Sequence, residues 1–186
     1  MTIFILGLAL FFGVHGFGAF ARSARQRVIG RIGALPYKGL YSLFALAGFA
    51  LIIMGWRDAD ATALYVTPLY LRHVTYILML IAMILIVAAY TPSGRIAHWV
   101  KHPMLAAVRI WAFAHLLVNG EVRSVLLFGA FLAFAVADRI AVKRRNEPTP
   151  AAGPWPHDAL AIVAGAGVYA LIFFYLHRYI AGVDLG

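Results

Sequence analysis

The sequence has 186 residues, of which 63% are hydrophobic and only 12% are charged, and its mean hydropathy is +0.86. Soluble domains contain about 45–50% apolar and about 25% charged residues, so this composition excludes an ordinary water-soluble fold. The formal charge is +9, but the basic residues lie in short clusters between apolar runs, which indicates loops beside an anionic leaflet rather than a nucleic-acid-binding face. The chain has no cysteine, which excludes disulfides, thiolate metal sites and a cysteine nucleophile.

Six apolar stretches approach the roughly 20 residues that a helix needs to cross a bilayer. In chain order they are residues 2–21, 39–56, 73–90, 103–118, 124–142 and 158–179. The fourth is the shortest and also contains Arg109 and His115. The pattern predicts an all-α, polytopic transmembrane bundle of about six helices. We expect one integral membrane domain over residues 1–186, with a core at 1–145, a linker at 146–157 and a final helix at 158–179.

Helix-breaking residues separate the predicted spans. A Thr-Pro-Ser-Gly run at 91–94 closes the third span, and Asn-Gly at 119–120 ends the fourth. Pro103 fits the first turn of the fourth span, where its missing N–H costs nothing. Between these two spans, residues 95–101 carry apolar side chains at helical spacing, which predicts a short helix at the membrane interface.

The basic residues predict how the chain crosses the membrane. The loops after the first, third and fifth spans, with the adjoining end of the fifth span, hold eleven of them: Arg22, Arg25, Arg27, Arg31, Lys38, Arg95, Lys101, Arg139, Lys143, Arg144 and Arg145. The opposite side holds Arg57, Arg72, Arg123 and Arg178. Because basic loops stay in the cytoplasm, a multi-pass protein of the cell inner membrane with both termini periplasmic is expected. No basic residue precedes the first span, which weighs against a cleaved signal peptide.

Small residues recur every four positions on two of the predicted spans. They are Gly129, Ala133 and Ala137 on the fifth span, and Ala9 and Gly13 on the first. Such stripes predict flat ridges where helix backbones approach one another closely. They indicate a bundle without indicating a function.

His15 lies within the first span among Gly13, Gly16 and Gly18. An ionisable group at membrane depth is costly and is therefore a candidate for function. Two interpretations remain open. The glycines clear room for a flat, bulky group against the helix, or they allow close packing while His15 bonds to a neighbouring helix.

His115 lies inside the fourth span, with Trp111 and Asn119 one turn away on the same face. His102 begins that span and shares a face with Arg109. Thirteen residues separate the two histidines by roughly 20 Å along a helix and by about 140° around it. They cannot ligate one metal centre together. A two-histidine site therefore needs a ligand from another helix, and His15 is the most deeply placed candidate.

Arg109 needs an anionic partner within the span. Asp138 on the fifth span lies at a comparable depth, which predicts an Arg109–Asp138 ion pair. The alternative is that Arg109 binds a carboxylate of a cofactor, such as a haem propionate.

The remaining histidines, His73, His98, His157 and His177, fall at interfaces or in the linker and are expected to be structural or solvated. The sequence contains no HxxxH or HExxH pattern, which disfavours a closed zinc site. Imidazoles on separate helices of a bundle suit haem iron better.

The motifs around these histidines closely resemble those of the NnrU family of bacterial membrane proteins. They are Lys-His-Pro-Met-Leu at 101–105, Trp-Ala-Phe-Ala-His-Leu-Leu-Val-Asn-Gly at 111–120, Leu-Leu-Phe-Gly at 126–129, Asp-Arg-Ile at 138–140 and Phe-Gly-Val-His-Gly at 12–16. The family is associated with nitrite and nitric oxide metabolism in denitrifiers. It is also similar, more distantly, to 15-cis-zeta-carotene isomerase, a redox-dependent haem b membrane enzyme.

This resemblance implies haem b as a cofactor, with His15 and His115 as axial iron ligands and His102 at a further motif position. The expected cofactor-binding residues are His15, His102, Arg109, Trp111, His115 and Asn119. Membrane lipids are expected partners, together with a lipophilic polyene or nitric oxide, and nucleic acid is not. Three functions stay open: a cis-trans isomerase acting on a polyene, a redox or nitric oxide-sensing module, and an assembly protein for denitrification enzymes.

Overall fold

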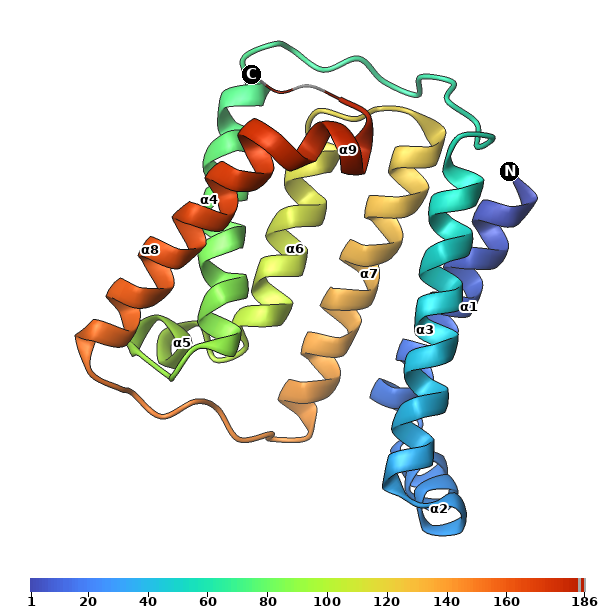
Figure 1. Ribbon diagram of the computed structural model, residues 1–186, viewed down its shortest axis with the longest axis vertical. Helices are drawn as coiled ribbons and strands as arrows, with labels where there is room; N and C mark the ends of the chain where they lie inside the picture. The colour runs from blue at the N-terminus through green and yellow to red at the C-terminus, as the bar shows by residue number, and fades with distance from the viewer. Residues whose placement is uncertain (184, 186) are drawn as a thin grey trace. The chain divides into compact units, whose positions relative to one another are not determined.

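The structure is a computed structural model that describes every residue except 184 and 186. The described residues form helices and turns, with no β-structure beyond one isolated bridge between Ala63 and Glu121 (Figure 1). The chain divides into two compact units. Unit 1 comprises Met1–Val66 and Gly120–Arg144, and unit 2 comprises Thr67–Asn119 and Arg145–Gly186.

Five helices in the described part of the chain are long and apolar enough to cross a membrane. They are α1 (Thr2–Phe20), α3 (Ala34–Trp56), α4 (Leu71–Tyr90), α7 (Val122–Arg144) and the continuous run Trp155–Ala181, which contains α8 (Trp155–Leu171), the π-helix η1 (Ile172–Leu176) and α9 (His177–Ala181). The predicted fourth span is α6 (Pro103–Leu116), which is too short to be counted with them. The prediction of a polytopic helical bundle is confirmed.

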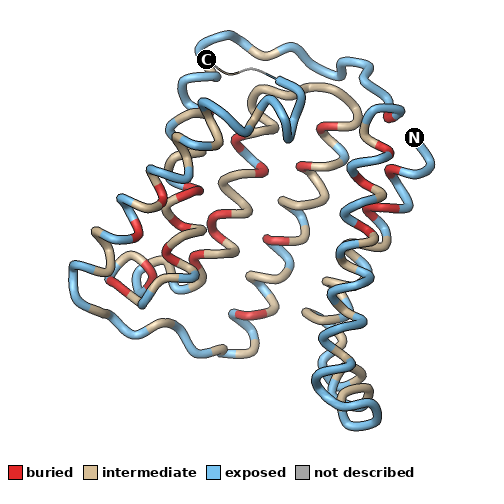
Figure 2. Tube along the Cα trace, in the orientation of Figure 1, coloured by how far each residue is buried: buried red, intermediate tan, exposed pale blue. Residues whose placement is uncertain are grey.

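Large apolar side chains cover the outer surfaces of these helices. Leu43 and Leu46 on α3 are 61% and 65% exposed, and Val163 on α8 is 72% exposed. Figure 2 shows exposed residues along the long helices, with buried ones confined to stripes. Exposure of this kind is unfavourable in water and favourable in lipid, so the fold fits a multi-pass membrane protein.

The first basic segment is helical, which the sequence analysis did not predict. Residues 22–38 were expected to form a loop, but Arg22–Ile32 is a helix (α2) and α3 already begins at Ala34. Pro36 falls in the first turn of α3, where a missing N–H is tolerated. Gly33 joins the two helices at φ 88°, a backbone conformation that favours glycine.

Unit 1 is held together by close packing of α1 against α3. A Cβ atom added at Gly7 would lie 2.6 Å from the backbone nitrogen of Ile52, and one at Gly48 would lie 2.7 Å from that of Phe11. Phe4 is fully buried in the same interface. Glycine is therefore required there because no side chain fits between the two backbones.

Helix α7 joins unit 1 through contacts at its start and along its length. The Val122 amide donates to the Thr62 carbonyl at 3.0 Å, and the Phe131 ring lies edge-on to Phe12 at 4.9 Å. Within unit 1 the predicted small-residue ridge on α7 makes no close backbone contact at Gly129, where a Cβ would meet no heavy atom within 4 Å, and Ala133 is exposed.

Unit 2 packs α4 against α6 and α8. The Thr75 hydroxyl on α4 donates to the Ala114 carbonyl on α6 at 3.0 Å, and Ala107 of α6 is fully buried. A Cβ added at Gly165 of α8 would lie 2.5 Å from the Cα atom of Ile84. Small residues again allow close contact between helices.

The end of unit 2 that carries the linker is fixed by short polar contacts. The short helix α5 (Arg95–Val100) matches the predicted interfacial helix. The Asp158 carboxylate accepts hydrogen bonds from the Ile96 amide at 2.9 Å and the Arg95 amide at 3.1 Å. This carboxylate satisfies backbone donors at the start of α5 that have no partner within the helix.

Candidate functional site

His15 is held by a hydrogen bond within its own helix. Its Nδ1 atom lies 2.7 Å from the carbonyl oxygen of Phe11, one turn earlier in α1. A carbonyl oxygen can only accept, so the neutral ring carries its proton on Nδ1 and its lone pair on Nε2. This is the tautomer that ligates a metal through Nε2.

Aromatic rings from three helices surround His15. Phe11 of α1 stacks on the imidazole at 4.1 Å between ring centroids, with 27° between the planes. Tyr41 of α3 lies edge-on at 5.5 Å, and Phe134 of α7 lies at 6.2 Å. The ring is therefore fixed by packing as well as by its hydrogen bond.

The three glycines beside His15 have different surroundings. A Cβ at Gly13 would meet nothing within 4 Å, and the nearest neighbours at Gly16 and Gly18 would lie at 3.7 and 3.4 Å. Within unit 1, none of the three glycines brings the backbone of a neighbouring helix within 4 Å of an added Cβ. The space beside Gly13 belongs to a groove whose lining does not include His15, since residues 13 and 15 point about 200° apart on a helix.

His115 has a matching hydrogen bond in α6. Its Nδ1 atom lies 2.8 Å from the carbonyl oxygen of Trp111, and the two rings lie 5.2 Å apart. The side-chain amide of Asn119 donates to the His115 carbonyl at 2.9 Å. Trp111, His115 and Asn119 thus occupy successive turns, as the sequence indicated, and the Asn119 side chain adds a hydrogen bond to a carbonyl that also accepts the Val118 and Asn119 amides.

The two other candidates on α6 make local backbone contacts. His102 is the residue before the helix, and its carbonyl accepts the Ala106 amide at 3.0 Å. The Arg109 Nε atom donates to the Leu105 carbonyl at 3.1 Å. Arg109 belongs to unit 2 and Asp138 to unit 1, so their ion pair stays a prediction.

The remaining histidines lie outside the cores of the long helices. His98 and His157 each place Nδ1 near a backbone carbonyl oxygen, of Pro150 at 3.0 Å and of Ser93 at 2.9 Å, and both contacts hold the linker. An Nδ1 bond to a carbonyl is therefore not unusual in this chain. What distinguishes His15 and His115 is that the acceptor is one turn earlier in an apolar helix.

The described residues contain no group of three or more His, Cys, Asp or Glu side chains that could hold a metal ion. A porphyrin iron requires only one or two axial ligands, and neutral imidazole is the commonest. The donor chemistry of His15 and His115 fits that requirement.

Sequence reasoning found the histidines but missed part of their surroundings. Phe11 could have been found, because it lies four residues before His15 and so on the same face. Tyr41 and Phe134 come from other helices, and no spacing in the sequence brings them to His15.

These observations define a polytopic helical membrane protein with histidines held inside its apolar helices. The family model described as NnrU protein matches residues 3–185, essentially the whole chain, so the chain belongs to the NnrU family. Comparison with curated proteins and with solved structures found no match.

Proposed function

We propose that this NnrU-family protein binds haem b in the membrane, with His15 and His115 as the axial iron ligands. The observation that carries the proposal is the shared arrangement of these two side chains. Each donates Nδ1–H to the carbonyl oxygen four residues earlier, and each lies against an aromatic ring. The arrangement fixes the ring orientation and places the lone pair on Nε2, as metal-ligating histidines require.

The packing around each proposed ligand, within its own unit, supports the proposal. Phe11, Tyr41 and Phe134 hold the His15 ring in one orientation. The Thr75 hydroxyl bonds the carbonyl of Ala114, directly before His115, and so ties that turn of α6 to α4. Both ligands therefore stand on packed helices rather than on loops, which favours a defined coordination geometry.

Haem iron bound in this way supplies one-electron redox chemistry and, where an axial ligand is exchangeable, a binding position for nitric oxide. We propose a redox role in nitrite or nitric oxide metabolism, in keeping with the family. Arg109, Trp111 and Asn119 would support the α6 ligand, and His102 would fix the start of the same helix.

The proposed location is the cell inner membrane with both chain termini periplasmic. In unit 1, the Met1 amino group donates to the Asp58 carbonyl at 2.9 Å, so the chain start lies at the same end as the end of α3. Helix α2 and the Lys143–Arg144 end of α7 carry six of the ten basic residues of the unit, whereas the opposite end carries Arg57 and Arg123. This separation of charge supports the proposed orientation.

The test is the absorption spectrum of protein purified in detergent. A Soret band is expected, and His15→Ala and His115→Ala should each shift it or abolish it. His73→Ala is the matched control, because His73 lies at the start of α4 and contacts Tyr76 edge-on at 6.2 Å. Unchanged spectra in both ligand variants would refute the assignment.

Two further measurements separate the possible roles once haem is bound. Isomerisation of a cis polyene by the reduced protein alone would identify an isomerase. A stable nitric oxide complex without product would identify a sensor or redox module. If neither isomerisation nor a stable nitric oxide complex is observed, and a nitrogen-oxide enzyme co-purifies with the protein, the protein is an assembly factor.

A further inference from the structure

Unit 1 contains an apolar groove along a face of α1 that does not include His15. Its volume is about 350 Å³, and it is lined by α1, α2 and α3. Along α1 it extends from Ala9 to Phe17, a distance of about 12 Å at 1.5 Å per residue. The α2 side is formed by Val28 and Ile32. The groove therefore follows about two turns of α1 and reaches from the long helices to the short basic helix.

One polar group in the groove has no partner. Tyr37 of α3 contributes to the lining, and its hydroxyl oxygen is buried with no hydrogen-bond partner among the described residues. Buried hydroxyls are normally satisfied, and leaving one without a partner is unfavourable. Because this oxygen has almost no accessible surface, a ligand's acceptor oxygen at this end of the groove satisfies it only when the Tyr37 ring turns toward the groove.

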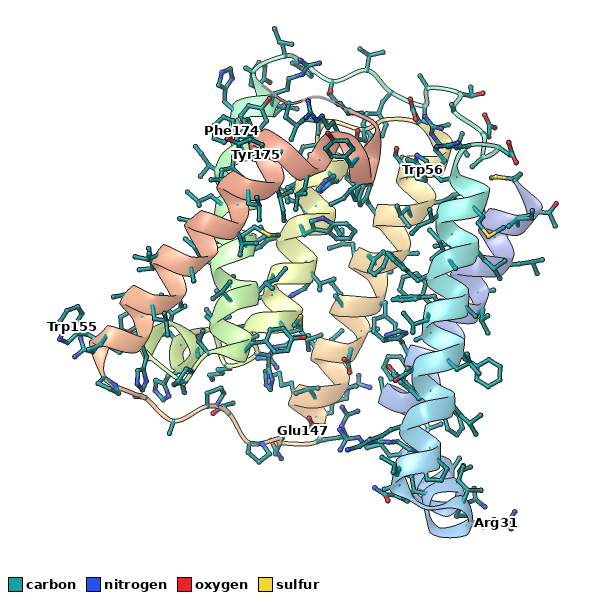
Figure 3. All side chains as sticks on the ribbon, in the orientation of Figure 1. Arg31, Trp56, Glu147, Trp155, Phe174 and Tyr175 are labelled. Carbon is teal, nitrogen blue, oxygen red and sulfur yellow. The ribbon has the colours of Figure 1, made fainter. Side chains whose placement is uncertain are left out.

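The same end of the groove is strongly basic. Residues 22–38 contain four arginines and Lys38, with no acidic residue. The Arg25 guanidinium carbon lies 5.7 Å from the centre of the Tyr37 ring. Arg25 precedes Val28 by three residues and so shares the groove face of α2, while Figure 3 shows Arg31 at the tip of that helix.

We propose that this groove binds an anionic phospholipid, with one acyl chain between α1 and α3 and the phosphate at Arg25 and the Tyr37 hydroxyl. The apolar lining suits an acyl chain, and the basic end complements a phosphate. The lipid phosphate supplies the acceptor that Tyr37 lacks. The lining contains no histidine, but it shares Tyr41 with the surroundings of His15.

The experiment is native mass spectrometry of the purified full chain, titrated with dioleoyl phosphatidylglycerol or dioleoyl phosphatidylcholine. Wild-type protein should bind phosphatidylglycerol about tenfold more tightly than phosphatidylcholine, as expected for a charge-assisted hydrogen bond to phosphate. Arg25→Gln and Tyr37→Phe should each remove most of that preference and leave phosphatidylcholine binding unchanged.

Arg27→Gln is the matched control. It removes the same charge from the same helix, but Arg27 lies roughly 120° from the direction of Val28 and Ile32 around α2. It should keep the lipid preference. An equal loss in the Arg25 and Arg27 variants would show attraction by net charge alone and would overturn the proposal.

Gly13→Leu tests whether the acyl chain uses the groove. A Cβ at Gly13 meets no atom within 4 Å, so the larger side chain fills the groove without displacing a helix. Binding of both lipids should fall. Unchanged lipid binding would overturn the site, and so would tight binding without charge preference, which would identify a neutral apolar ligand. None of these lipid-binding measurements depends on haem. The lipid proposal can therefore fail or succeed independently of the haem proposal.

Discussion

Phe11 and Gly48 bring α1 and α3 into direct backbone contact. A Cβ at Gly48 would lie 2.7 Å from the Phe11 nitrogen and 3.0 Å from its Cα atom. The carbonyl of the same Phe11 accepts the hydrogen bond from His15, and the Phe11 ring stacks on the imidazole. The packing of these two helices therefore also positions the histidine.

Gly48→Ala should destabilise the protein, because the added methyl group meets backbone that cannot yield. Overpacking of this kind costs about 1–3 kcal/mol. The measurement is thermal unfolding in detergent, followed by helical circular dichroism. Gly129→Ala is the control, since a Cβ there meets nothing within 4 Å, and it should be neutral or stabilising by up to about 1 kcal/mol. Equal effects of the two substitutions would contradict the packing described for α1 and α3.

Phe11→Leu should weaken haem retention without abolishing it. The backbone hydrogen bond to His15 remains, but the aromatic contact, worth about 0.5–1.5 kcal/mol, is lost. The rate of haem transfer to apomyoglobin measures the effect and should rise several-fold. Phe174→Leu is the control, because Phe174 is 63% exposed on η1 and should leave the rate unchanged. An unchanged transfer rate in Phe11→Leu would show that the stacking of Phe11 on His15 does not contribute to haem retention.

Thr75→Val should loosen the contact between α4 and α6. The substitution keeps the side-chain shape and removes the hydrogen bond to the Ala114 carbonyl. Interhelical hydrogen bonds in membranes contribute about 0.6 kcal/mol, so a small loss of thermal stability is expected. Thr91→Val removes a bond to Val87 within its own helix and is the comparison. A larger loss in Thr91→Val would contradict the role given to Thr75.

Asp158→Ala should release the start of α5. The carboxylate accepts the Arg95 and Ile96 amides, and losing such a cap costs about 1 kcal/mol. Hydrogen–deuterium exchange should accelerate at these two amides and leave α7 unaffected. Asp58→Ala is the control, because the hydrogen bond described for Asp58 uses its backbone carbonyl. Unchanged exchange at residues 95 and 96 would show that α5 does not depend on this cap.

The sequence predicted the long helices because each requires a continuous apolar run, which is visible locally. It also placed Trp111, His115 and Asn119 on one face, since helical spacing fixes that relation. It missed α2, whose arginines give it a polar average, although four arginines in eleven residues are compatible with a helix at an interface.

Contacts between helices were harder to predict. Small-residue spacing pointed to Gly129 and Gly13, whereas the close contacts use Gly7 and Gly48. Many positions carry small residues, and which of them meets a neighbouring backbone depends on helix rotation. The spacing of residues within one helix does not determine how that helix is rotated against its neighbours.

The most direct test of the account is electron paramagnetic resonance of the oxidised, purified protein. Two imidazole ligands predict a low-spin ferric haem signal, converted to high spin by His15→Ala and by His115→Ala and retained in His73→Ala. A signal that neither ligand variant alters, or a protein that carries no haem when it is produced with ample haem supply, would contradict the assignment.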